Sequence, residues 1–220
     1  MKNSYLIAVV LLFCISGTAV AQSWSVGVKA GPSLTSISQS YSGRMDESYS
    51  ALWGFDAGIQ ARYAFTDWFA VRADLSFMSR SYRMDRNLQY LDPVYTKYTN
   101  SFITLPVMAD FSFGGKKLRG HAYCGGYGAY WISARREGKT FWMTDYYVYF
   151  EDFGERRQFN NEDQRLIAGA VGGFGLSYSC FSIDVLYYYD LVSHHKGYAH
   201  LSDPRYLNTL SITLGWAFSF

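Results

Sequence analysis

The sequence predicts an all-β protein: an eight-stranded antiparallel up-and-down transmembrane β-barrel with short periplasmic turns and four long extracellular loops. Three observations lead to this prediction. Apolar and polar residues alternate with a period of two in eight segments, short and long connections alternate between them, and an even strand number lets a ring close. The segments are 24–34, 51–65, 68–82, 98–113, 119–134, 164–178, 181–192 and 206–220.

The amino terminus has a composition of its own. Lys2 precedes an apolar run from Tyr5 to Ile15, and small residues end the segment at Ala21. This pattern is typical of a secretory signal peptide over residues 1–21, because the apolar run is too short to span a bilayer as a helix. Residues 22–220 carry no linker-like stretch, so we expect them to form one outer-membrane β-barrel domain.

The alternation is clear in the second, third, fourth and seventh segments. In 51–65, apolar residues occupy the odd positions from Trp53 to Phe65, with polar or small residues between them. The fifth and sixth segments are rich in glycine, which leaves the facing of their residues open. In the last segment the apolar residues from Leu210 to Phe220 share one face, and we expect this strand to close the ring against the first.

Charged residues of these segments share the face that carries small side chains. The large aromatic residues of the opposite face would overfill an eight-stranded lumen, so the small face is predicted to point inward. We expect opposite charges to pair there, away from lipid, and to plug the lumen. The predicted lumen charges are Lys29, Asp56, Arg62, Arg72, Asp74, Asp110 and Asp184. A soluble ligand-binding barrel, with the apolar face inward, is the alternative.

Aromatic residues also gather at the strand ends, as in the two girdles of a membrane barrel. Near the short turns they are Trp24, Phe65, Trp68 and Phe113. Toward the long loops they are Trp53, Tyr82, Tyr98, Trp131 and Tyr206.

Charge and cysteine content exclude some classes. A net charge of +2 gives no argument for a nucleic-acid partner. Outside the leader only Cys124 and Cys180 remain, which is too few for a disulfide framework, and the sequence leaves open whether they are oxidised. No cofactor is expected.

The stretch from Asn100 to Phe111, which contains "LPVMADF", resembles the PorT-like outer-membrane β-barrel family of Bacteroidota. The signal peptide, the glycine-rich strands and the terminal Phe220 add to the resemblance. It implies location in the outer membrane among lipid and, through Phe220, recognition by the barrel-insertion machinery. Some relatives serve gliding or protein secretion and many have no assigned role, so the resemblance leaves membership of such an assembly open.

The longest loop is unusually aromatic. Between residues 140 and 159, rings are interleaved with charges, a composition typical of recognition surfaces. Either this segment binds a protein or glycan partner, or it forms a hairpin that prolongs the fifth and sixth strands above the membrane and packs on itself. The predicted partner-binding residues are Trp142, Tyr146, Tyr147, Tyr149, Phe150 and Phe153.

A second loop, "SHHKGYAH", concentrates histidine. His194, His195 and His200 have side chains suited to zinc or copper, but an exposed polar loop also explains them, and we predict no metal site. His200 and Ser202 are spaced as in lipid A deacylases, with Asp203 at a position where those enzymes have Asn. No other catalytic motif is present, so we expect no enzymatic activity, with a lipid-modifying hydrolase as the alternative.

Overall fold

The computed structural model describes residues 23–39, 46–88, 91–115, 117–143, 147–156, 158–159, 163–194 and 205–219. Within them are the strands β1 (Ser23–Gln39), β2 (Asp46–Ala64), β3 (Phe69–Leu88), β4 (Leu91–Gly114), β5 (Leu118–Met143), β6 (Val148–Arg156), β7 (Leu166–Tyr178), β8 (Phe181–Asp190) and β9 (Arg205–Ser219). No helix in this described part of the chain has the length and apolar character needed to cross a membrane. The predicted leader lies outside the described residues.

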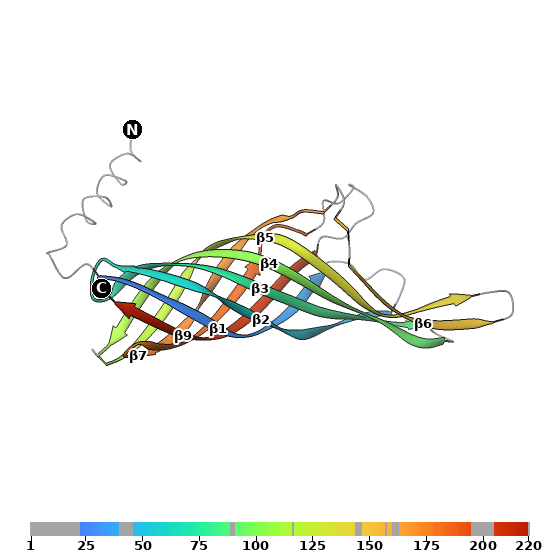
Figure 1. The fold of residues 1–220 in the computed structure, drawn as a ribbon, viewed down its shortest axis with the longest axis horizontal. Coiled ribbons are helices and arrows are strands. Elements are labelled where there is room, and N and C mark those ends of the chain that lie inside the picture. The colour runs from blue at the N-terminus through green and yellow to red at the C-terminus, as the bar shows by residue number, and fades with distance from the viewer. Residues whose placement is uncertain are drawn as a thin grey trace, which may run out of the picture.

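Eight of the strands form a closed antiparallel ring in the order β1, β2, β3, β4, β5, β7, β8, β9 (Figure 1). The ring closes where β9 pairs with β1, with Val28 opposite Trp216. Short turns at 65–68, 115–117 and 179–180 lie at the same end as the start of β1 and the end of β9. The predicted eight-stranded up-and-down ring is confirmed.

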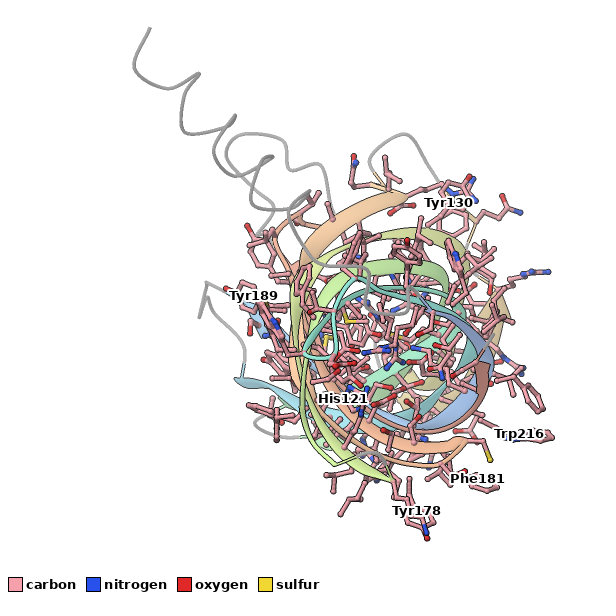
Figure 2. The ribbon with its side chains drawn as sticks, turned by 90° about the vertical axis from the view of Figure 1, so that its left-hand side faces the viewer. His121, Tyr130, Tyr178, Phe181, Tyr189 and Trp216 are labelled. Atoms are coloured by element: carbon pink, nitrogen blue, oxygen red, sulfur yellow. The ribbon has the colours of Figure 1, made fainter. Side chains whose placement is uncertain are left out.

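The outer face of the ring is apolar. Alternate residues such as Val28, Ile59, Leu105 and Leu214 are exposed, although they belong to regular strands. Viewed from the short-turn end, Tyr178, Phe181 and Trp216 point outward and His121 lies inside the ring (Figure 2). The period-two pattern therefore turns its large apolar side chains outward, which excludes the soluble barrel.

Beyond the ring, at the end opposite the short turns, several strands continue. Leu91–Thr96 of β4 pairs with β3, and Arg135–Met143 of β5 pairs with β6. Figure 1 shows the resulting sheet projecting past the ring. The described residues of 83–97, predicted as a loop, are thus strand, and those of 135–156 form the hairpin that the sequence left open as an alternative. Their alternation is weak because both faces of this sheet lie outside lipid, so pairing continues without an apolar face.

The strand β5 contains a β-bulge, and two residues of the predicted aromatic girdle face the lumen instead. Ser101 pairs with Ser133 and Phe102 with Trp131, which leaves Ile132 as an extra residue. The bulge shifts the alternation only for the residues after it, so that Ala134 is buried. Trp131 is buried because it continues the inward row of Tyr127 and Ala129, and Tyr82 is buried because it continues that of Met78 and Arg80. Trp131 and Tyr82 were predicted at the lipid surface and belong instead to an apolar cluster in the upper lumen.

Candidate functional site

The middle of the lumen is filled by an ion-pair network from several strands. Arg72 on β3 donates to Asp74 at 2.9 Å and to Asp184 on β8 at 2.8 Å. Lys29 on β1 lies 3.0 Å from Asp74 and 3.4 Å from Asp56. These five side chains are buried, and each charge faces an opposite one. This arrangement fills the lumen with paired charge.

The sixth and seventh predicted lumen charges lie nearer the short turns. The Arg62 Nε donates to the Asp110 Oδ2 at 2.6 Å. The network therefore follows the lumen from its middle toward the short-turn mouth, and the structure brings all seven predicted lumen charges inside the ring.

Above the middle layer is a second charged cluster that our prediction did not include. Arg80 is fully buried and donates to Asp190 at 2.9 Å, while His194 lies 2.6 Å from the same carboxylate. Tyr127 donates its hydroxyl hydrogen to Asp190, and the Phe102 ring stacks over the Arg80 guanidinium. Charged side chains and aromatic rings together fill the lumen at the end from which the strands extend.

The alternation in β3 and β8 already placed Arg80 and Asp190 on the inward face, so the sequence contained a signal for this pair. His121 and Tyr127 carried no usable signal. The neighbouring glycines of β5 hide the alternation of apolar and polar residues, so the sequence does not show which face of the strand is inward. His194 was expected in an exposed loop, and this expectation was wrong: its contact with Asp190 buries it.

The sheet beyond the ring carries a groove of about 230 Å³. Its lining is apolar at Met84, Val94, Phe141 and Phe153, with the cations Arg86 and Lys139 beside them. Phe153 is one of the predicted partner-binding residues. Side chains of β3, β4, β5 and β6 form the groove, so it exists only because these strands extend beyond the ring.

Other predicted partner-binding residues lie along β6 and just before it in the β5–β6 hairpin. Tyr147, Tyr149 and Phe150 are exposed, and the rings of Tyr147 and Tyr149 are 6.1 Å apart. Trp142 belongs to β5, but its side chain lies outside the described residues, as does all of Tyr146. The aromatic segment is therefore a hairpin that keeps part of its aromatic surface exposed.

Several sequence candidates fall outside the described residues: His195, His200, Ser202, Asp203 and Phe220. Within the described ranges, no group of three His, Cys, Asp or Glu side chains is arranged to hold a metal ion. Cys124 and Cys180 are free thiols.

A sequence profile of the outer membrane protein β-barrel domain matches residues 20–195. The chain belongs to this family. It is accordingly a protein of the bacterial outer membrane, whose short turns face the periplasm and whose extended strands face the cell exterior. The exposed apolar belt of this outer-membrane barrel is the surface in contact with lipid.

Solved outer-membrane proteins resemble this barrel at low identity. OprG from Pseudomonas aeruginosa is 11% identical, with a TM-score of 0.48, over 90% of this chain and 96% of its own. Ail from Yersinia pestis, in complex with the heparin analogue sucrose octasulfate, is 13% identical, with a TM-score of 0.42, over 89% and 99%. Neisserial surface protein A is 16% identical, with a TM-score of 0.42, over 89% and 97%. No curated protein matches the chain.

Proposed function

We propose that this barrel is a plugged membrane anchor that displays a recognition surface outside the cell. The observation that carries the proposal is the sheet extension: β5 and β6 project beyond the ring, with exposed aromatic rings next to an apolar groove. Rigid strands hold these rings in place, so binding a protein or glycan would lose little conformational entropy.

The proposal includes the route to the membrane. A signal peptide over residues 1–21 would export the chain, leaving 22–220 as the barrel domain, and Phe220 would present the last strand to the barrel-insertion machinery. The "LPVMADF" stretch supports a PorT-like member of Bacteroidota, and such a barrel would take part in a secretion, gliding or other surface assembly through its extended hairpin.

The test is affinity capture from native outer membranes with the tagged barrel. A variant with Tyr149→Ser and Phe150→Ser removes two exposed rings of the hairpin, and Asp152→Ser changes an exposed residue of the same strand as a matched control. We expect the double variant to lose the captured protein or glycan and the control to retain it. Equal capture by both variants would refute recognition through the hairpin.

A further inference from the structure

The periplasmic mouth of the barrel contains a cavity that the proposed recognition function does not use. Its volume is about 220 Å³, and polar side chains from strands on all sides of the ring line it, including Arg62, Arg119, His121, Ser177 and Ser182. In Figure 2, which looks into this mouth, His121 lies inside the ring. The cavity opens at the short-turn end, so small periplasmic molecules have a route to these groups.

His121 connects a carboxylate to a serine across this cavity. Its Nδ1 lies 2.9 Å from the Asp110 Oδ1, and its Nε2 lies 2.8 Å from the Ser177 Oγ. An ionised carboxylate only accepts hydrogen bonds, so in neutral His121 the Nδ1 carries the hydrogen. The Nε2 then has a free lone pair, and the Ser177 hydroxyl donates to it. This is the tautomer that activates a serine nucleophile.

The carboxylate that orients the ring is itself held firmly. Arg62 donates to Asp110 at 2.6 Å and to the Ser112 hydroxyl at 2.9 Å, and Ser112 lies 3.3 Å from the Asp110 Oδ1. His121 and Asp110 are both buried. The histidine therefore keeps one orientation, with Nε2 directed at Ser177, and the geometry does not depend on a flexible loop.

The same mouth carries positive charge close to the serine. Arg119 is the direct cross-strand partner of Ser177, and Lys117 lines the cavity at the adjoining turn. Neither cation forms an ion pair with any residue in the part of the chain that the structure describes. Among the described residues both cations are open to an anionic group of a ligand, and the strand register puts Arg119 beside Ser177, where it can oppose negative charge that develops in the reaction.

We propose that Ser177, His121 and Asp110 form a hydrolytic triad that cleaves small acyl esters bearing an anionic group. The Ser177 Oγ attacks the acyl carbon while its proton passes to the His121 Nε2, and this proton then leaves on the alcohol product. Water, deprotonated by His121, attacks the acyl-serine, and its proton returns to Ser177 as the carboxylic acid departs. Asp110 is a positioning residue throughout.

The sequence-based expectation of no enzymatic activity rested on the absence of linear catalytic motifs. A triad whose members come from β4, β5 and β7 leaves no such motif, because only strand pairing brings the three residues together.

The test uses the mature barrel folded in detergent, treated with diisopropyl fluorophosphate and analysed by peptide mass spectrometry. We expect the reagent to label Ser177 in the wild type. His121→Gln should reduce labelling about 100-fold, because the general base is lost. Ser182→Ala is the matched control: it removes a hydroxyl from the same cavity that forms no hydrogen bond among the described residues, and labelling should be unchanged.

Hydrolysis of mono-4-nitrophenyl succinate and 4-nitrophenyl acetate measures turnover and charge preference. The wild type should prefer the anionic succinyl ester, Arg119→Gln should lose that preference, and Ser177→Ala should lose turnover of both esters. Absence of labelling at Ser177, or equal turnover by Ser177→Ala and Ser182→Ala, overturns the proposal. Both serine variants are small changes that preserve strand pairing, so this comparison decides the matter even if His121→Gln does not fold. Loss of partner capture by the extracellular hairpin would leave this result unaffected.

Discussion

At the scale of single residues, Arg72 is central to the middle layer of the lumen. Its guanidinium contacts Asp74, Asp184 and the Gln60 side-chain oxygen, the last at 2.8 Å. Desolvating a charge is expensive, and the interaction is favourable only while all these partners remain in place. These contacts therefore link three strands of the ring, β2, β3 and β8, from the inside.

The change Arg72→Met tests this role. It leaves Asp184 buried without its cation, so we expect the free energy of unfolding in detergent to fall by about 3–5 kcal/mol. Tryptophan fluorescence during urea titration measures it. Arg83→Met is the control, because the Arg83–Asp85 pair is exposed and its loss should cost less than about 1 kcal/mol. Equal destabilisation by both changes would show that burial does not decide the contribution of these pairs.

At the scale of the strand, close backbone approach at the seam between β1 and β9 restricts what Gly31 can be replaced with. A Cβ atom there would collide with the backbone carbonyl of Ile212, and a backbone atom cannot rotate away. Gly128 on β5 differs, since a Cβ atom there would meet no heavy atom within 4 Å. The two glycines thus have different reasons to be present.

We expect Gly31→Ala to separate the two strands that close the ring and to lower the fraction of protein that folds into detergent micelles. Gly128→Ala should leave folding unchanged or slightly stabilise the barrel, because alanine restricts the unfolded chain. The fraction folded is measured by the mobility of unheated protein in gel electrophoresis. A Gly31→Ala barrel that folds as fully as wild type would contradict the close packing of this seam.

At the scale of the whole molecule, the apolar belt predicts that a charge on the outer face destabilises the barrel more the closer it lies to the middle of the bilayer. Ile59→Arg places a cation on the outer face of β2 well inside the ring, and we expect it to lower the free energy of unfolding in lipid vesicles by about 2–4 kcal/mol. Leu118→Arg, beside a short turn, should cost only about 0–1 kcal/mol, because the side chain reaches the interface. Both residues are exposed on the ring exterior. Equal costs would contradict the assigned belt.

The filled lumen also predicts the absence of a pore. Buried side chains of the two charged layers and the aromatic cluster occupy the path along the axis. We expect no steady ion conductance when the purified barrel is inserted into a planar bilayer. Stable conductance that is altered by substituting Arg72 or Asp74 would show that ions pass between these side chains, and would contradict the plug.

The sequence by itself determined the ring, its eight strands and the direction of its apolar face. Alternation with a period of two is imposed by lipid on one side and a packed lumen on the other, so it can be read without a structure. It also indicated the inward charges, because a charge such as Asp56 or Arg72 has no stable place in hydrocarbon. Outside the membrane this constraint ends, which is why the sequence left the β5–β6 hairpin as one of two alternatives and did not predict the extension of β3 and β4.

Only the tertiary structure decided which charges meet and what lies at the periplasmic mouth. Pairing of β4 with β5 brings Asp110 to His121, and pairing of β5 with β7 brings His121 to Ser177, which are 56 positions apart in the sequence. The bulge at Ile132 likewise made Ala134, rather than Ser133, the next inward residue of β5. These outcomes depend on strand register, which joins residues distant in sequence and leaves no local pattern.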